Sequence, residues 1–197
     1  RRAIVLLSDG DTVWMEEPGY RGVRATLAAA GCRAVPVPVD SEGLSVTAGA
    51  RLAARPRLIC ISPSHQYPLG ITMSLARRLE LLAYARRMRA WVLEDDYDSE
   101  FRYDGTPLLA LAGIDHLSRV IYMGTFAKTL FPGLRLGYCA LPERLVGPVT
   151  TARAALDRFP GTLLEGAVAD MLNSGAFAAN LRKVRGIYRE ARDVLAS

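Results

Sequence analysis

The chain has 197 residues, of which 50% are hydrophobic and 23% are charged, and its net charge is +5. This length suffices for one well-packed α/β unit, and the composition excludes a disordered or low-complexity protein. No apolar run approaches the ~18 residues that a membrane span needs, and no signal peptide is visible, so we expect a cytoplasmic protein without membrane contact.

Apolar strands alternate with helices along the chain. The first seven residues are expected to form a helix that runs toward Asp9. We predict strands at 12–16, 34–39, 58–62, 91–95, 120–124 and 134–141. Helical spacing of apolar residues predicts helices at 21–30 and 72–90, and a helical stretch at 145–197 with breaks near 159–161 and 173–175. This alternation indicates a three-layer α/β fold with a mostly parallel sheet and helices on both faces.

Lys128 is one of only two lysines among 25 basic side chains, and it follows the apolar run 120–123. Lysine, unlike arginine, can lose its proton and form an imine with a carbonyl cofactor. A solvated loop lysine is the alternative explanation. The position at the end of an expected buried strand favours the chemical role, because ligands of open α/β sheets bind at strand ends.

An acidic cluster at 94–100 begins where the expected strand 91–95 ends. Pyridoxal phosphate (PLP) needs a carboxylate to keep its ring nitrogen protonated and a lysine to carry its aldehyde, and Asp95 with Lys128 can supply that pair. A solvated or calcium-like acidic loop is the alternative for Asp95.

Three further residues could complete such a site. Arg135 is a fixed cation seven residues after Lys128 and can bind a phosphate, and Thr125 offers a hydroxyl to the same anion. Tyr20 follows Pro18-Gly19 and could place an aromatic face over a flat ring. Arg135 as a surface cation and Tyr20 as a half-buried packing residue remain open alternatives.

The segments 62–70, 94–103 and 124–135 together resemble the MocR family. These are GntR-type bacterial transcription regulators whose large domain is similar to the large domain of fold type I aminotransferases. The resemblance covers essentially the whole chain, and it implies PLP as the cofactor. It also implies that Lys128 forms the internal aldimine and that Asp95 pairs with the pyridine nitrogen.

The resemblance implies roles for the other residues of the site. Tyr97 matches the tyrosine near the phenolic oxygen of the cofactor, and Arg135 and Thr125 match phosphate ligands. Tyr20 matches the aromatic residue that stacks on the ring. His65, with Gln66 and Tyr67, falls where ordinary aminotransferases carry an Asn-Pro turn, and these three residues are expected only to line the pocket. Ala127 stands where the family often has serine, which removes one possible hydrogen bond.

Two functions follow from the resemblance. The first is a PLP-binding, effector-sensing domain of a MocR/GntR-type regulator, with an amino compound or PLP itself as effector. The alternative is an aminotransferase of class I or II that transfers an amino group between an amino acid and a 2-oxo acid. Whether the chain is an enzyme stays open, because the pocket chemistry is nearly the same in both.

We interpret residues 1–197 as one aminotransferase-like large domain that is truncated at both ends. The phosphate-binding loop and any winged helix are expected upstream, and the small domain with the arginine for the substrate carboxylate downstream. DNA binding is assigned to that upstream module, and a homodimer is expected.

The cysteines and the basic residues are expected to be structural. Cys32, Cys60 and Cys139 lie in apolar runs without paired spacing, which indicates buried free thiols and no metal site. The arginines of 77–89 and the basic residues of 182–192 are interpreted as solvated helix faces or dimer contacts, not as a DNA-binding surface.

Overall fold

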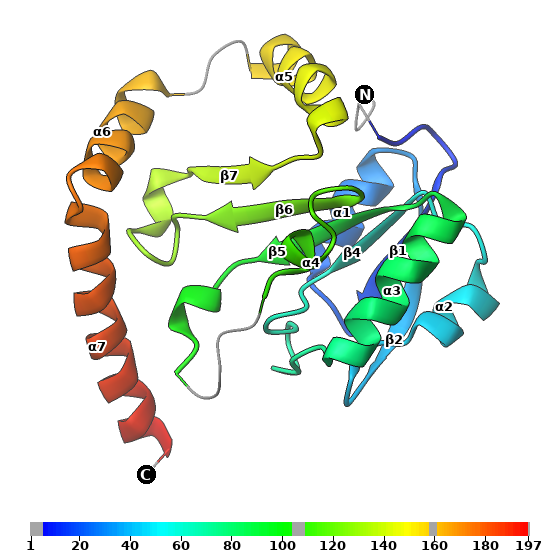
Figure 1. The fold of residues 1–197 in the computed structure, drawn as a ribbon, viewed down its shortest axis with the longest axis horizontal. Helices are drawn as coiled ribbons and strands as arrows, with labels where there is room; N and C mark the ends of the chain where they lie inside the picture. The colour runs from blue at the N-terminus through cyan, green and yellow to red at the C-terminus, as the bar shows by residue number, and fades with distance from the viewer. Residues whose placement is uncertain (1–5, 104–108, 158–160, 197) are drawn as a thin grey trace.

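A computed structural model describes residues 6–103, 109–157 and 161–196. Its centre is a seven-stranded sheet in the order β3-β2-β1-β4-β5-β6-β7 (Figure 1). The strands are β1 (Thr12–Glu17), β2 (Arg33–Asp40), β3 (Gly43–Leu44), β4 (Leu58–Ile61), β5 (Trp91–Asp96), β6 (Val120–Thr125) and β7 (Gly137–Ala140). The five central strands are parallel, and the edge strands β3 and β7 are antiparallel to their neighbours.

Helices cover both faces of this sheet, which confirms the expected α/β architecture. Helices α2 (Val46–Leu52), α3 (Leu75–Met88) and α4 (Leu111–Ile114) contribute to the core on one face. Helices α1 (Arg21–Ala29) and α5 (Glu143–Asp157) contribute to the core on the other face. In Figure 1, α2 and α3 lie in front of the sheet and α1 lies behind it. Alternate residues of each parallel strand therefore enter two separate cores.

Trp14 of β1 is the centre of the core beneath α2. Its side chain is fully buried, its Nε1 donates to the Ala53 carbonyl oxygen at 2.9 Å, and its ring stacks on Tyr84 at 5.0 Å. Gly49 of α2 faces this ring so closely that a Cβ there would lie 2.7 Å from it. The α2 backbone can approach the sheet only because this residue has no side chain.

Two more helices lie beyond the sheet edge formed by β7. They are α6 (Thr162–Asn173) and α7 (Ala176–Ala196), seen in Figure 1 as an orange and red column. No described residue of α7 is buried, yet the helix is tied to two loops. Asn180 Nδ2 donates to the Thr129 carbonyl oxygen at 3.0 Å, and Tyr188 packs on Phe101 with ring centroids 5.0 Å apart. No helix in the described part of the chain is long and apolar enough to cross a bilayer.

The expected element boundaries need several corrections. The predicted N-terminal helix falls largely on residues 1–5, outside the described residues, and residues 6–8 are not helical. The strand predicted at 134–141 is wrong in its first half, because a 3-10 helix (Pro132–Leu134) and Arg135 with φ of 51° precede β7. The sequence pattern also missed α2, α4 and β3, which are too short to show a periodicity.

Helix α3 starts and ends inside the predicted range of 72–90. The Ser74 hydroxyl caps its start by accepting from Arg77 N at 3.1 Å, and Arg89 ends it in the left-handed conformation. Serine is a preferred N-cap residue because its oxygen satisfies a free backbone N–H.

Two side-chain predictions were wrong. Cys139 is exposed, because it lies on the edge strand β7, whereas Cys32 and Cys60 are buried as expected. Arg78 is not on a solvated face: it is 1% exposed and donates to the carbonyl oxygens of Met73, Pro63 and Leu109 at 2.8–3.0 Å. This arginine fastens the loop between β4 and α3 to the core.

Candidate functional site

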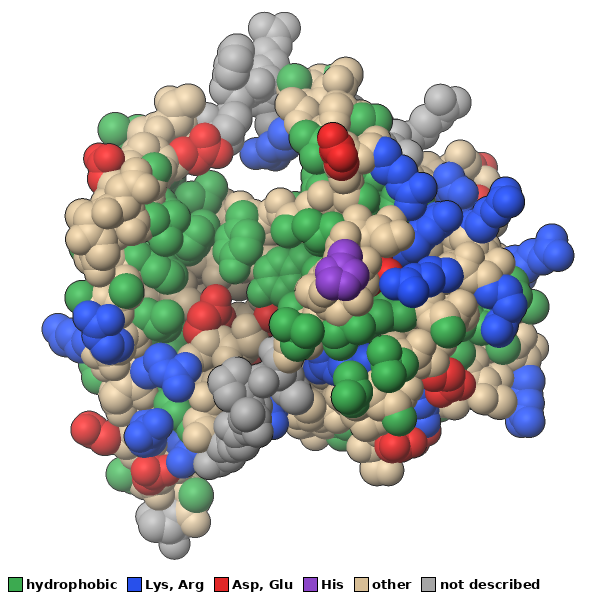
Figure 2. Space-filling model, in the orientation of Figure 1, with side chains coloured by type: hydrophobic (Ala, Val, Ile, Leu, Met, Phe, Trp, Pro, Cys, Tyr) green, Lys and Arg blue, Asp and Glu red, His purple; other side chains and the backbone are tan. Residues whose placement is uncertain are grey.

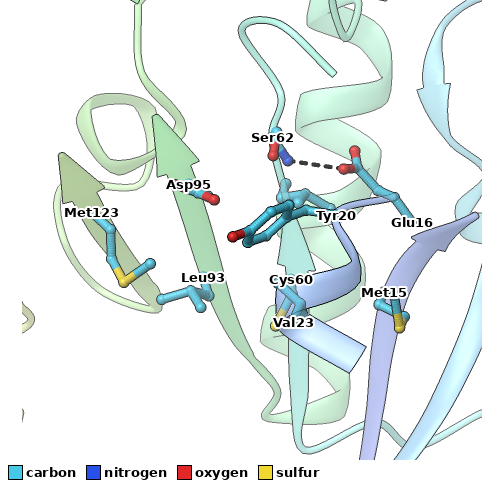
Figure 3. Close-up of a pocket in the computed structure, with 10 residues that line it drawn as sticks. Met15, Glu16, Tyr20, Val23, Cys60, Ser62, Leu93, Asp95 and Met123 are labelled. Carbon is cyan, nitrogen blue, oxygen red and sulfur yellow. Dashed lines mark hydrogen bonds between the residues drawn. The ribbon is translucent and has the colours of Figure 1, made fainter. Parts of the chain in front are cut away.

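A pocket with about 380 Å³ of empty space, part of it open to solvent, lies at the carboxyl ends of the parallel strands. Its wall comes from β1, β4, β5 and β6 and from the start of α1 (Figure 3). The lining side chains are Met15, Glu16, Tyr20, Val23, Cys60, Ile61, Ser62, Leu93, Asp95 and Met123. Ligands of parallel sheets bind at this edge because the loops that follow the strands converge there.

Asp95 is the acidic residue of the pocket that the sequence predicted. Its carboxyl is partly buried among apolar neighbours, and Figure 3 shows it on β5 facing Tyr20. Burial raises the pKa of Asp95, and the nearby Asp96 and Asp98 raise it further. A carboxyl whose described surroundings all disfavour its charge is suited to a cationic partner.

Tyr20 lies over the same pocket from the N-terminus of α1. Its side chain is 56% exposed, and its ring meets Tyr67 edge-on, with centroids 6.1 Å apart. Gly22 leaves room for this ring, because a Cβ at residue 22 would lie 2.4 Å from it. The walls formed by Tyr20, Val23 and Leu93 are apolar and suit a flat aromatic ligand.

Glu16 is a second buried carboxyl in the pocket, and the sequence reasoning missed it. It is 6% exposed, and its Oε2 accepts from Ser62 N at 3.2 Å (Figure 3) and from Gln66 Nε2 at 3.5 Å. Burial raises the pKa of Glu16 to about 7, the two hydrogen bonds oppose the shift, and the charge of Asp95 adds to it. Its position at the end of a strand, just before Pro18-Gly19-Tyr20, is the same signal that identified Asp95.

Tyr97 and His65 come together beside this pocket. The Tyr97 hydroxyl donates to the His65 carbonyl oxygen at 2.9 Å, and the two rings stack with centroids 6.0 Å apart. His65 Nδ1 lies 2.6 Å from Asp98 Oδ2. Burial raises the pKa of Tyr97, and the charges of Asp98 and Asp95 add to this effect. The hydroxyl therefore stays protonated at neutral pH and can donate a hydrogen bond.

Thr125 is the last residue of β6, and Lys128 and Arg135 lie on the segment that follows it. Lys128 is exposed in the turn 126–130, which Leu130 N closes by donating to the Phe126 carbonyl oxygen at 2.9 Å. The Thr125 hydroxyl accepts from Ala127 N at 3.1 Å, so the turn before the lysine is fixed. Arg135 is exposed and ends the short 3-10 helix.

The structure thus brings together part of the predicted set. Asp95 and Tyr20 share the pocket, and Tyr97 and His65 contact each other at the adjacent strand ends. The described lining does not include Tyr97, His65, Lys128, Thr125 or Arg135, and the roles of these five residues stay predictions. Gln66 and Tyr67, expected to line the pocket, are also absent from its described lining, and Gln66 is instead buried behind it.

The fold and the pocket define an α/β protein with a pocket at the carboxyl edge of a parallel sheet. The chain belongs to the aminotransferase class I and II family, which matches residues 2–197.

Transcription regulators are among its most similar curated relatives. The chain is 45% identical to the probable rhizopine catabolism regulatory protein MocR of Rhizobium meliloti, over 98% of this chain and 38% of the relative. It is 38% identical to the transcriptional regulator TauR of Rhodobacter capsulatus, over 98% of this chain and 39% of the relative. The chain therefore spans about two fifths of the length of these regulators.

Solved aminotransferases share the fold at lower identity. Kynurenine aminotransferase of Pyrococcus horikoshii, solved with PMP, has a TM-score of 0.89 and 28% identity over 96% of this chain and 48% of its own. LysN, the alpha-aminoadipate aminotransferase of Thermus thermophilus, was solved with N-(5'-phosphopyridoxyl)-L-leucine. It has a TM-score of 0.85 and 30% identity over 94% of this chain and 49% of its own.

Proposed function

We propose that this chain is the PLP-binding, effector-sensing part of a MocR/GntR-type transcription regulator. The observation that carries the proposal is the contrast in identity, each over 94–98% of this chain: 45% and 38% to the two regulators, against 28% and 30% to the two aminotransferases. DNA binding is assigned to a module outside these residues, and the effector is an amino compound or PLP itself.

The donor set of the pocket fits this cofactor. Asp95 suits a protonated ring nitrogen, because burial and its acidic neighbours leave its carboxyl in need of a cation. Tyr20 and the apolar wall suit the flat ring. When bound, PLP supplies an electrophilic aldehyde and an electron-withdrawing ring.

Each of the predicted residues has a distinct task in this proposal. The Lys128 amine would hold the cofactor covalently through its aldehyde carbon. Tyr97 keeps its proton, and its hydroxyl would turn from the His65 carbonyl oxygen to donate a hydrogen bond to the phenolic oxygen. Arg135 and Thr125 bind the phosphate as a cation and a hydroxyl donor. His65 contributes to the pocket rim through its contact with Tyr97.

A working aminotransferase is the second candidate, supported by the fold match to solved aminotransferases. In that case the Lys128 amine, once released from the cofactor, would move a proton between the substrate carbon and the cofactor carbon.

The full-length polypeptide distinguishes the two candidates. PLP and a panel of amino compounds would be added to it, and two readouts followed: affinity for DNA from upstream of its own gene, and amino transfer to a 2-oxo acid. A regulator changes its DNA affinity at least fivefold with ligand, the lower end of typical coupling energies (~1 kcal/mol). Sustained transfer at about 1 s⁻¹ or faster, with unchanged DNA affinity, would decide for the enzyme.

A homodimer is part of the proposal. Several large apolar side chains of α6 and α7 are exposed, as a partner surface requires: Leu163, Leu164, Leu172, Ile187, Val194 and Leu195. Figure 2 shows apolar side chains gathered along the inner side of this helical column. Sedimentation of the full-length polypeptide tests this part separately.

A further inference from the structure

Gln66 is a buried polar residue that the proposed chemistry does not use. Its side chain is 1% exposed, in the loop between β4 and α3, next to the pocket but outside its described lining. A buried amide is costly unless its hydrogen-bonding groups are satisfied. The hydrogen-bond partners of the Gln66 amide show which parts of the chain it holds together.

The amide of Gln66 connects two loops that are far apart in sequence. Its Nε2 donates to the Pro18 carbonyl oxygen at 2.8 Å and to the Tyr67 carbonyl oxygen at 2.6 Å, and it approaches Glu16 Oε2 at 3.5 Å. Its Oε1 accepts from Leu69 N at 3.1 Å. Carbonyl acceptors on one side and an N–H donor on the other fix the orientation of the amide.

The two carbonyl oxygens belong to the segments that carry Tyr20, which lines the pocket, and Tyr67, whose ring meets it. Pro18 lies two residues before Tyr20, and Gly19 between them is confined, because a Cβ there would lie 2.3 Å from the Glu16 carbonyl oxygen. Tyr67 follows Gln66 directly and meets the Tyr20 ring edge-on. A shift of the Gln66 amide therefore moves the backbone on both sides of this pair.

We infer that Gln66 is a positioning residue that holds Tyr20 and Tyr67 in place and thereby sets the slot for the cofactor ring. This inference rests on the proposed function, because it requires a flat ligand beneath Tyr20. Glu16 helps to hold the two segments together, because its carboxylate oxygen Oε2 accepts a hydrogen bond from Ser62 N, directly after β4. Gln66 acts through Tyr20 and needs no contact with the ligand.

A double-mutant cycle on the full-length polypeptide tests this inference. The dissociation constant of PLP would be measured from its visible absorption band in the parent, Gln66→Met, Tyr20→Leu and the double variant. Each single change is expected to weaken binding about tenfold. If Gln66 acts through Tyr20, the double variant is also about tenfold weaker than the parent. A loss of about a hundredfold, the product of two independent effects, would overturn the inference, and so would unchanged binding in Gln66→Met.

Controls separate positioning from general destabilisation. Gly49→Ala strains the core around Trp14, away from the pocket, and is expected to lower the unfolding midpoint while leaving PLP affinity unchanged. Circular dichroism of the cofactor band is a second readout, and it is expected to fall in Gln66→Met because the ring is less firmly held. If Gln66→Met does not fold, Gln66→Asn takes its place in the same cycle, since its shorter amide cannot reach both Pro18 and Leu69.

The failures of the inference and of the proposed function are distinguishable. A parent polypeptide that gives no visible band with PLP contradicts the proposed function. If the parent gives the band but the losses of PLP affinity in the two single variants multiply in the double variant, only the role of Gln66 is contradicted.

Discussion

Asp95 and Glu16 are two carboxyls in one pocket whose surroundings give them different tasks. Asp95 has only burial and acidic neighbours acting on its pKa, whereas Glu16 accepts hydrogen bonds from Ser62 and Gln66. A bound pyridinium would reverse the shift at Asp95, because an opposite charge at contact distance stabilises the carboxylate. We therefore expect Asp95 to pair with a cationic ring nitrogen. Glu16 instead holds Ser62 and Gln66, in the segment after β4, against the end of β1.

Asp95→Asn is expected to weaken PLP binding by about 10- to 100-fold, because a charge-assisted hydrogen bond contributes about 1.5–3 kcal/mol. The visible band of the remaining complex is also expected to shift, since the ring nitrogen loses its proton. Titration of the full-length polypeptide measures both, with Asp193→Asn on the exposed end of α7 as the control. Equal affinity and an equal spectrum in Asp95→Asn would remove Asp95 from the cofactor site.

Glu16→Gln is expected to change how stability depends on pH. The pKa of Glu16 is raised in the folded protein, from its ordinary 4.5 to about 7, so the folded state favours the protonated carboxyl. The parent therefore loses stability as pH rises from about 4.5 to about 7, and the loss is complete above that range. The glutamine variant lacks this loss. The free energy of unfolding of the variant, relative to that of the parent, is therefore expected to rise by on the order of 2 to 3 kcal/mol between pH 5 and pH 8.

Urea unfolding of cofactor-free parent and variant at the two pH values measures this difference. Parallel stability profiles of the two proteins would show that Glu16 is ionised in the folded state at both.

At the scale of the elements, the sequence predicts the strands better than the connections. Strands β4, β5 and β6 are short apolar runs, and the strand ends place Asp95 and Thr125 where the pattern indicated. The 3-10 helix before β7 left no periodic signal. The hydrogen bonds of the Gln66 side chain could not be predicted from the sequence either. One of their acceptors is the carbonyl oxygen of Pro18, which is 48 positions away. Contacts of this kind depend on the tertiary structure, and one sequence does not reveal them.

Helix α7 contacts the segments that follow β5 and β6. Asn180 bonds the carbonyl of Thr129, the residue after Lys128, and Arg185 Nη2 donates to the Arg102 carbonyl oxygen after β5 at 3.1 Å. Three basic residues of this helix, Arg185, Arg189 and Arg192, also lie over the Tyr103 ring at 5.0–5.4 Å, so its basic face is not wholly solvated.

A matched pair of glycine substitutions tests the packing of the elements. Gly49→Ala is expected to destabilise the protein by about 1–3 kcal/mol, because the buried Trp14 ring cannot move away from the new methyl group. Gly166→Ala on α6 meets no atom within 4 Å and is expected to stabilise the helix by about 0.5–1 kcal/mol. Thermal unfolding compares the two variants. A Gly49→Ala variant as stable as Gly166→Ala would contradict the close approach of α2 to β1.

At the scale of the whole molecule, the described residues form one sheet with a pocket at the carboxyl ends of its parallel strands, and the chain spans about two fifths of the regulators that it resembles. The resemblance to the MocR family predicted the fold class and the family relationship, and both are confirmed. The placement of Lys128, Thr125 and Arg135 around a cofactor remains a prediction, because none of the three is among the described residues that line the pocket.

The most direct test of the proposed function is a titration of the full-length polypeptide with PLP, in the parent and in Lys128→Ala. The parent is expected to develop the visible absorption band of a lysine-linked cofactor, and borohydride is expected to fix the cofactor to Lys128. Lys128→Ala is expected to fold and to show neither. A parent without the band, or a Lys128→Ala variant that retains it together with a borohydride-stable adduct at the site, would contradict the assignment of this chain as a PLP-binding domain that uses Lys128.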